Sequence, residues 1–330
     1  MNTMKGGRHQ AMRAGIKIQE KRSVKIRKGI AACLLIFALL LTAGCDTDRG
    51  ILSSASTEAD GVKADQNSGQ VVSVDVSGRM EADFLDIGKA DCIVIRSDSK
   101  TAVVDTGYED TSQTVLSFLE SSGVDQIDYL ILTHFDKDHV GGAAALLEAY
   151  KTDTVFQPDY SADEEDSKPY LRYVDAMEKY GCHAVTVKEN FTFIMDDVVF
   201  TIYPPEKLEY DSDKDNNRSL VMTVQHGEVR MLLAGDAERD RIDEILFGIP
   251  DLEADLLKVP HHGHRERNSE ELFDAAGAEF AVICADRDDK KDGPDDDIIE
   301  ALEERGTRVF VTGDGIVKAV SDGKNLNVTQ

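Results

Sequence analysis

From residue 80 onward, short apolar runs rich in branched side chains alternate with stretches of polar and turn-forming residues. Runs of this length and composition are typical of buried strands. Two of them end in groups that carry chemistry, one in Gly235-Asp236 and the other in a cluster of histidines. Strands are predicted at residues 80–88, 90–95, 101–107, 127–132, 191–194, 198–203, 219–225, 231–236, 256–264, 280–284 and 307–311.

Helical patterns lie between and after these runs. In residues 111–121, Val115, Phe118 and Leu119 fall on one helical face. Further helices are predicted at residues 143–147, 164–180 and 297–305. The chain begins with strands and continues with alternating strands and helices, and it shows no internal repeat. This order predicts an α/β domain in which two mixed sheets pack face to face with helices outside.

The first 44 residues differ in character from the rest. Six Lys/Arg between residues 17 and 28 precede the apolar segment Ile30–Leu41, which is too short to span a bilayer comfortably. Leu41-Thr42-Ala43-Gly44-Cys45 follows, and it resembles a bacterial lipobox, in which the thiol of Cys45 is lipidated after cleavage. An uncleaved N-terminal anchor is the alternative. Both interpretations hold the rest of the chain at the cell membrane, on its extracytoplasmic face.

The next segment, residues 45–78, is rich in Ser, Asp, Gly, Gln and Asn and contains few large apolar residues. Such a composition cannot bury a core, so the segment is predicted to be a flexible tether. The chain is thereby divided into a lipoprotein signal peptide at 1–44, the tether, and one folded domain at 79–330.

Charge narrows the classes of partner. The formal charge is −26, and without the first 44 residues it is −34. A surface this acidic repels phosphate backbones at long range, which disfavours tight non-specific binding of nucleic acid. The chain has no Trp and only 6% aromatic residues, which disfavours a stacking platform for single strands. A local basic groove or bound metal ions could still hold a phosphodiester.

The stretch Thr133–Gly142 concentrates candidate chemistry on a loop between a predicted strand and a predicted helix. Two imidazoles and two carboxylates, from His134, Asp136, Asp138 and His139, lie within six positions. A loop held at both ends can aim such donors at one or two divalent metal ions. The alternative is a set of polar loop residues that face water, and the density of donors favours the metal site.

Two later strand ends carry similar groups. Asp236 follows an apolar run, and alone it could be a helix N-cap. With the metal loop present, a carboxylate that bridges two metals is favoured. His261-His262 would ordinarily be a surface pair, and here it is expected to supply the last metal ligand. Groups at strand ends have rigid support and one exposed tip.

The metal loop resembles the first motif of the metallo-β-lactamase superfamily, with Asp136 in place of its second histidine. Further segments resemble the metallo-β-lactamase domain of the ComEC competence family and its secreted relatives. The matching segments are residues 86–91, 104–107, 133–142, 217–221, 233–238 and 257–263. The resemblance implies an αββα sandwich, a centre with one or two metal ions, and hydrolytic chemistry.

The resemblance also implies roles for individual residues. One metal would be bound by His134 and Asp136, the other by Asp138 and His139 with His261, and Asp236 would bridge them. Asp138 and His262 are the expected catalytic residues, His262 by contacting substrate or transferring a proton, although which of His261 and His262 binds metal stays open. The residues expected behind the ligands or near the substrate are Asp105, Asn217, Ser219 and His264.

Two departures from the family pattern bear on the chemistry. Asp136 and Asn217 stand where imidazoles are common, which makes the first site richer in oxygen and shifts its preference from zinc towards manganese. The ComEC-like Gly-His-Pro-His segment is replaced by Asp292–Asp297. Either a histidine that contacts substrate is absent, or Asp295 replaces it with the opposite charge preference. The alternative is that the run is a solvated loop that leads into a helix whose first turn favours carboxylates.

The function expected from these residues is metal-assisted hydrolysis, most readily of a phosphodiester. The acidic surface favours small or cell-envelope phosphodiesters over nucleic acid. Hydrolysis of β-lactams is disfavoured by Asp136, and di-iron chemistry with oxygen is disfavoured because no room remains for a flavin domain. The alternative from another class is a surface lipoprotein that binds a ligand through a degenerate metal centre.

Overall fold

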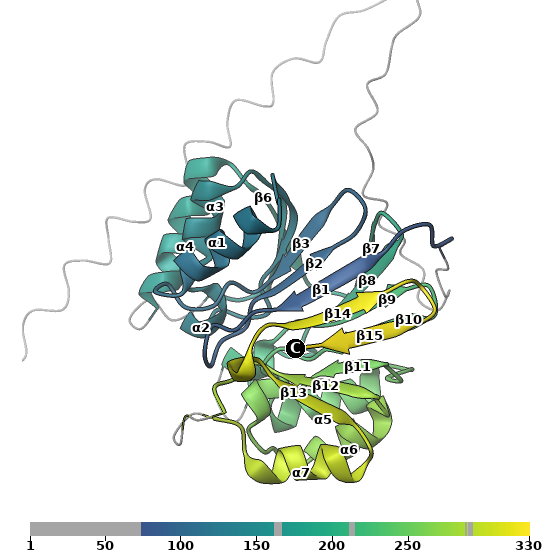
Figure 1. Ribbon diagram of the computed structural model, residues 1–330. Helices are drawn as coiled ribbons and strands as arrows, with labels where there is room; N and C mark the ends of the chain where they lie inside the picture. Colours follow the sequence, from purple (N-terminus) through teal and green to yellow (C-terminus); the bar gives the residue numbers. More distant parts are fainter. Residues whose placement is uncertain (1–73, 162–166, 211–214, 288, 290–292) are drawn as a thin grey trace, which may run out of the picture. The chain divides into compact units, whose positions relative to one another are not determined.

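The computed structural model describes residues 74–161, 167–210, 215–287, 289 and 293–330. The predicted signal peptide, Cys45 and most of the predicted tether lie outside these described residues. The described residues form the predicted α/β sandwich of two mixed sheets with helices outside, shown in Figure 1. None of the helices in the described part of the chain has the length and apolar character needed to cross a bilayer.

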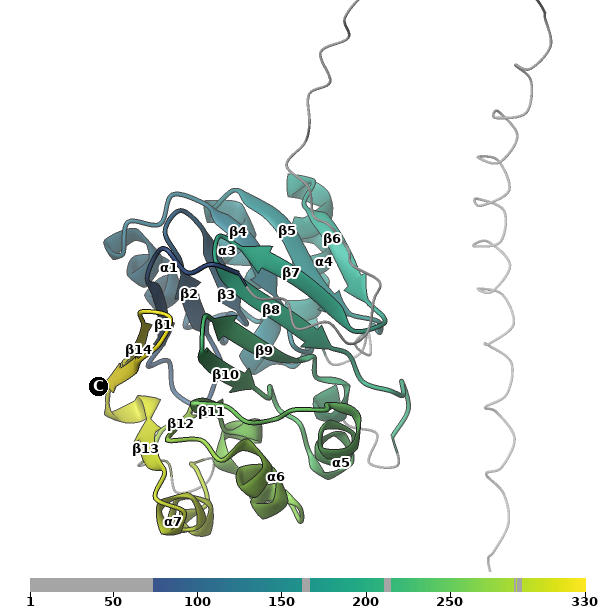
Figure 2. The same cartoon turned by 90° about the vertical axis from the view of Figure 1, so that its right-hand side faces the viewer.

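The first sheet has eight strands in the order β15-β14-β1-β2-β3-β4-β5-β6. Its pairs are antiparallel from β15 to β3 and parallel from β3 to β6. The hairpin β14–β15 comes from the C-terminal end of the chain and lies beside β1, as both Figure 1 and Figure 2 show. The strands are β1 Met80–Phe84, β2 Ile93–Arg96, β3 Thr101–Val104, β4 Ile127–Ile131, β5 Thr152–Pro158, β6 His183–Val187, β14 Val317–Ser321 and β15 Leu326–Thr329.

The second sheet has seven strands in the order β13-β12-β11-β10-β9-β8-β7. It is antiparallel from β7 to β10 and parallel from β10 to β13. The strands are β7 Phe191–Met195, β8 Val198–Tyr203, β9 Val221–His226, β10 Val229–Leu233, β11 Leu256–Lys258, β12 Phe280–Ile283 and β13 Arg308–Val311.

Helices cover the outer face of each sheet. Figure 1 shows α1, α3 and α4 over the first sheet and α5, α6 and α7 over the second. The helices are α1 Ser112–Ser121, α2 Lys137–Val140, α3 Ala143–Ala149, α4 Lys168–Tyr180, α5 Arg239–Gly248, α6 Ser269–Ala276 and α7 Asp296–Glu304, with 3-10 turns η1 Asp215–Arg218, η2 Pro260–Gly263 and η3 Thr312–Asp314.

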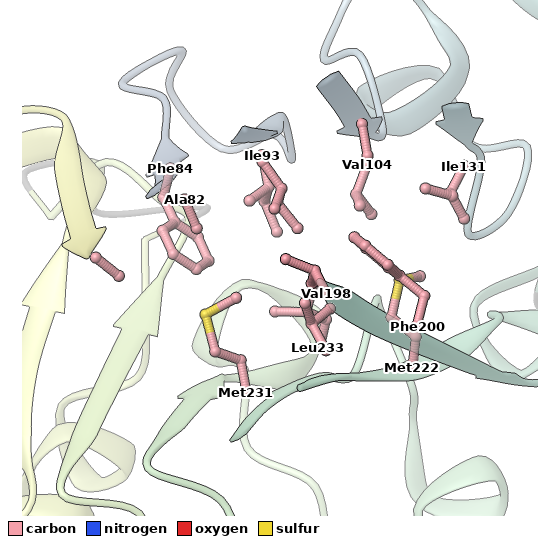
Figure 3. Packing of buried hydrophobic residues seen from close by; sticks show 14 of the residues in the cluster. Ala82, Phe84, Ile93, Val104, Ile131, Val198, Phe200, Met222, Met231 and Leu233 are labelled. Carbon is pink, nitrogen blue, oxygen red and sulfur yellow. The ribbon is translucent and has the colours of Figure 1, made fainter. Parts of the chain in front are cut away.

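Three apolar clusters hold these layers together. The central one lies between the sheets, where Phe84 and Ile93 of the first sheet face Phe200 and Met222 of the second (Figure 3). The other two lie between each sheet and its helices. Many of the predicted strands are apolar at nearly every position. Their side chains can therefore be buried on both faces of the sheet, against the other sheet and against the helices.

Several boundaries differ from those predicted. β1 ends at Phe84 and β11 at Lys258, because polar and glycine-rich loops follow them. The predicted helix at 164–180 begins at Lys168 in the structure, where Ser167 caps it by accepting a hydrogen bond from Tyr170 N–H (3.3 Å). Among the described strands and α-helices, those that the sequence analysis did not predict are β5, β6, β14, β15, α2, α5 and α6.

A polar cluster joins the two sheets at one end of the sandwich, and we call it the clasp. Its members are Asp197, His226, Ser321 and Ser97. His226 Nδ1 lies 2.8 Å from Ser321 Oγ, and Asp197 accepts hydrogen bonds from Ser97 Oγ and from the backbone N–H groups of residues 77 and 78. The chain therefore enters the sandwich at the clasp, and β1 runs from there towards the other end.

Candidate metal centre

The candidate site lies at the end of the sandwich opposite the clasp, beyond the carboxyl ends of β3, β4, β10 and β11. β3 and β4 are parallel, as are β10 and β11, so the residues after these strands gather at one edge of each sheet. Leu220 N–H donates to the Thr133 carbonyl (2.8 Å) and joins the two edges. Gly235 has a φ of +54°, and a side chain there would lie 3.1 Å from Ser219 Cβ. A larger residue would push the loops of the two sheets apart.

Three histidines aim the same ring nitrogen into this site. His134 Nδ1 lies 3.0 Å from the hydroxyl of the preceding threonine, and His139 Nδ1 lies 2.8 Å from Asp105 Oδ2. His262 Nδ1 lies 2.8 Å from the backbone carbonyl oxygen of Cys284. All three Nε2 atoms are buried and make no hydrogen bond to any residue in the described ranges. Holding Nδ1 in this way fixes the ring and leaves Nε2 available to a metal.

Carboxylates complete the site from three sides. Asp236 Oδ2 lies 3.2 Å from His139 Nε2 and 3.0 Å from His262 Nε2. Asp138 Oδ2 lies 3.5 Å from His262 Nε2. Asp136 is the outermost of these groups, with its side chain 44% exposed and its Oδ2 3.9 Å from the Nε2 atom of His134.

The donor set fits a divalent cation. Donor atoms of His134, His139 and Asp236 lie within 4.8 Å of one another, and so do those of Asp138, His139 and His262. Buried imidazole nitrogens without hydrogen bonds cost free energy, and one or two metal ions bound among these donors would satisfy them. Nitrogen and carboxylate donors together are typical of zinc, manganese and iron sites.

The pKa values show how strongly the carboxylates act on the rings. Burial lowers the pKa of His134 to about 4. Burial acts in the same direction on His139 and His262, but the carboxylates outweigh it. Asp236 and Asp105 raise the pKa of His139 well above its usual range, and Asp236 with Asp138 raises the pKa of His262 to about 9. Protons on these two rings balance charge that a metal ion would otherwise balance.

The structure separates His261 from His262, a choice that the sequence left open. His262 is fully buried and faces Asp236, whereas His261 lies outside this group. His261 Nδ1 is 3.8 Å from Glu238 Oε1 and 3.7 Å from Glu266 Oε1. Both histidines have left-handed backbones, with φ of 49° and 53°, and this turn decides which ring enters the centre. The structure thus places His262 among the donors of the centre, whereas His261 belongs to a separate group with Glu238 and Glu266.

Asn217 and Ser219 support the centre from behind. Asn217 Oδ1 accepts a hydrogen bond from Arg241 N–H (3.0 Å) in the first turn of α5, so its side chain is engaged with the helix. Ser219 Oγ accepts from Asp236 N–H (3.2 Å) and lies 3.4 Å from His134 Nδ1. Ser219 is fully buried, so it positions two donors and does not reach a substrate.

Asp105 lies behind the donors and contacts both Thr133 and His139. Its Oδ1 accepts from Thr133 N–H (2.8 Å), and its Oδ2 accepts from Thr133 Oγ1 (2.6 Å). Its φ of 57° is a left-handed conformation that few residues other than glycine adopt. His264 lies farther out, with its ring centroid 5.0 Å from that of His261, and burial lowers its pKa. No described group of metal donors includes His264.

The acidic run that replaces the Gly-His-Pro-His segment leads into α7. Asp295 is the N-cap residue of this helix, and Asp296 and Asp297 lie in its first turn, where carboxylates favour the helix dipole. Asp295 Oδ2 accepts from Arg265 N–H (2.6 Å), and Asp295 N–H donates to the Gly263 carbonyl (3.0 Å). These contacts favour the interpretation of the run as a helix start.

Two buried residues beside the centre were not predicted. Lys258 Nζ lies 2.5 Å from Asp91 Oδ2, and both side chains are almost fully buried. The quoted segments contained both residues, but neither has a spacing that points to a metal ligand. At the mouth of the site, Lys89 Nζ and Tyr108 Oη each lie 3.5 Å from Asp138 Oδ2.

Known proteins with similar sequences share this domain. The chain is 28% identical to ComE operon protein 3 of Bacillus subtilis (strain 168) over 255 residues, which is 72% of this chain and 32% of that protein. It is 28% identical to Recombination protein 2 of Haemophilus influenzae over 63% of this chain and 24% of that protein. The chain thus spans about a third or less of the length of these curated relatives.

Solved structures share the fold. The metallo-β-lactamase fold protein YhfI of Bacillus subtilis matches with a TM-score of 0.50 at 14% identity, over 73% of this chain and all of that chain. A family model described as the metallo-β-lactamase superfamily matches residues 85–286, the part of the chain that holds the donors described above. The chain therefore belongs to the metallo-β-lactamase superfamily, and its metallo-β-lactamase domain is of the ComEC-like type.

Proposed function

We propose that this chain is a metal-dependent hydrolase of phosphodiester bonds that is held at the extracytoplasmic face of the cell membrane through Cys45. The observation that carries the proposal is the convergence of three buried, unbonded Nε2 atoms with the carboxylates of Asp138 and Asp236. A buried set of this kind has no use in packing and fits a divalent cation.

The metal is proposed to be zinc or manganese, as one or two ions. His139, His262, Asp138 and Asp236 would hold the more buried ion, and His134 and Asp136 with Asp236 would hold the outer one. The outer set has one nitrogen, which favours manganese there. When bound, such ions make a nearby water more acidic and stabilise negative charge on a phosphoryl oxygen.

The chain's own residues would bind and orient the substrate. Lys89 and Tyr108 lie at the mouth beside Asp138, where they can donate to the non-bridging oxygens of a phosphodiester. His264 is partly buried with a lowered pKa, so at neutral pH it is a neutral ring near the mouth that can exchange a proton. His262 is committed to the centre through both ring nitrogens, so proton transfer is reassigned from it to His264.

The substrate is proposed to be a small or envelope phosphodiester. The name of the relative from Haemophilus influenzae mentions recombination, which supports nucleic acid as a second member of the test panel. Against it stands the charge of −34 without the first 44 residues, which repels polyanions at long range. A short phosphodiester carries one or two charges and meets far less repulsion.

The test is elemental analysis of the purified chain together with hydrolysis of bis(p-nitrophenyl) phosphate, after chelation and after zinc or manganese is added back. We expect bound metal and turnover in the wild type. Asp138→Ala and Asp236→Ala should each reduce turnover at least about 100-fold, since each removes a metal donor. Asp125→Ala, at an exposed aspartate after α1, is the matched control and should keep full turnover.

Two results would contradict the enzyme. Full turnover in both Asp138→Ala and Asp236→Ala would remove these residues from the mechanism. A wild type without metal and without turnover on any phosphodiester would instead favour the surface lipoprotein that binds a ligand through a degenerate centre.

A further inference from the structure

A buried ammonium group lies directly beneath the metal centre. Lys258 is the last residue of β11, and its side chain is fully buried. Its Nζ atom lies 2.5 Å from Asp91 Oδ2, 2.9 Å from the Gly235 carbonyl oxygen and 3.5 Å from Asp236 Oδ1. The Gly235 carbonyl accepts a hydrogen bond from this ammonium group, and Asp91 pairs with its charge. Asp236 Oδ1 lies at ion-pair distance and makes no hydrogen bond to a described residue. Because its side chain is fully buried, Lys258 cannot contact a substrate.

The position of Asp91 ties this pair to the metal loop. Asp91 N–H donates to the Asp138 carbonyl (3.2 Å), and the Asp91 carbonyl accepts from Gly107 N–H (2.8 Å). Its other carboxylate oxygen, Oδ1, lies 3.6 Å from His262 Nδ1. A lysine is almost never buried this completely without a paired carboxylate, and Asp91 is that partner.

The two carboxylate oxygens of Asp236 face different partners. Its Oδ2 faces His139 Nε2 and His262 Nε2, whereas its Oδ1 faces Lys258. Only Oδ2 is on the side of the metal donors. The charge of Lys258 competes with a metal ion for the same carboxylate, and Asp91 limits that competition by holding Lys258 at the shorter distance.

We propose that Lys258 is a positioning residue that lowers the affinity of the centre for divalent cations, and that Asp91 opposes this effect. Lys258 takes one oxygen of Asp236 and part of its charge, so it weakens metal binding. Asp91 draws the ammonium group away from Asp236, so it strengthens metal binding. The inference rests on the proposed metal centre and is independent of the substrate.

The test is the dissociation constant for Mn²⁺, measured by isothermal titration calorimetry on the full chain in detergent after chelation. Lys258→Met should bind Mn²⁺ about tenfold more tightly than the wild type, because the competing charge is gone. Asp91→Asn should bind about tenfold more weakly, because Lys258 is then left with Asp236 alone. The double variant should lie within about threefold of the wild type.

A merely structural role gives a different pattern, because both single variants would then disturb Asp236 and weaken binding. That result, or unchanged affinity in both, would overturn the proposal. If Lys258→Met does not fold, the comparison of Asp91→Asn with the double variant decides, since removal of Lys258 in that background should restore affinity. Lys318→Met is the matched control, because Lys318 pairs with Glu81 and Asp83 and not with the metal donors.

The outcome separates this inference from the proposed function. A wild type that binds neither Mn²⁺ nor Zn²⁺ would overturn both. A wild type that binds Mn²⁺, with variants that shift in the wrong direction, would overturn the role of Lys258 and leave the proposed hydrolase untouched.

Discussion

At the scale of single residues, each histidine of the centre is paired with a second group that fixes the orientation of its ring. Thr133 and Asp105 hold the rings of His134 and His139, and the Cys284 carbonyl holds the ring of His262. Each of these contacts is made at Nδ1, so each ring presents Nε2. The rings are therefore in place before a metal arrives, and metal binding loses little side-chain entropy.

The protonation of His262 predicts how the stability of the metal-free protein depends on pH. Its pKa in the folded protein is about 9, above the ordinary value of 6.5. Because the folded pKa is the higher one, the stabilisation is fully present below pH 6.5 and is lost as the pH rises to about 9. The chelated protein should lose about 3 kcal/mol of unfolding free energy across this range.

Guanidinium chloride unfolding of the chelated protein at pH 6.5, 7.5 and 9 would measure this loss. His139 acts in the same direction, because its pKa is also raised. His262→Gln should show a smaller decline. Equal stability at pH 6.5 and 9 in the wild type would contradict the assignment of a protonated His262 to the metal-free state.

Local sequence was enough to predict which segments carry the donors. The metal loop and Asp236 lie at strand ends, and the structure gathers His134, Asp138, His139 and Asp236, whereas none of the described donor groups includes Asp136. Local sequence could not show which of His261 and His262 points into the centre. That depends on the left-handed backbone of both residues, which two adjacent histidines do not reveal. Lys258 and Asp91 were missed because their contact joins segments that are far apart in the sequence.

At the scale of elements, α5 is fixed to the site by its first turn. Asn217 Oδ1 accepts from Arg241 N–H, and the Arg241 side chain is buried against Glu244 (2.9 Å) and the Ser219 carbonyl (3.1 Å). The asparagine thus binds a helix N–H group that has no partner within the helix. Its position where other members of the superfamily carry a metal-binding histidine does not make it a ligand.

Replacement of Asn217 should therefore affect stability more than metal content. Asn217→Ala should lower the unfolding free energy by about 1–2 kcal/mol, because the buried N–H group of Arg241 loses its acceptor. Metal content by elemental analysis should stay that of the wild type. Asn327→Ala, at an exposed position of β15, serves as the control. Loss of metal in Asn217→Ala at unchanged stability would show that the asparagine is a ligand.

The strands that the sequence did not predict lack a strong local pattern. β6 and β15 are edge strands with exposed residues, and β5 begins with Thr-Asp-Thr and ends in proline. Such strands lack the long apolar runs that mark buried ones, and their pairing depends on neighbours elsewhere in the sheet. β14 pairs with β1, although the two strands lie near opposite ends of the domain's sequence, and no local pattern predicts such a contact.

At the scale of the whole molecule, the two sheets are joined at both ends by polar contacts of different kinds. The centre joins them at one end through metal donors, and the clasp joins them at the other. Asp197 is the hub of the clasp, with two backbone N–H groups, Ser97 and His226 around it. Burial opposes the charge of Asp197, but these donors outweigh burial and lower its pKa.

Removal of the hub should destabilise the sandwich without touching the chemistry. Asp197→Ala should lower the unfolding free energy by about 2–3 kcal/mol, because three partly buried hydrogen-bond donors and the buried ring of His226 lose their partner at once. Urea unfolding would measure the loss, and Mn²⁺ affinity should not change. Asp98→Ala, at an exposed aspartate nearby in the sequence, should cost less than about 0.5 kcal/mol. Equal losses in both variants would contradict the role of the clasp.

The entry of the chain at the clasp gives the domain a polarity. β1 carries the backbone from the clasp towards the centre, so the described domain is attached at one pole and has its metal donors at the other. The point where the chain enters the described domain and the metal donors therefore lie at opposite ends of the sandwich. A substrate could reach the donors without passing the segment that leads into the domain.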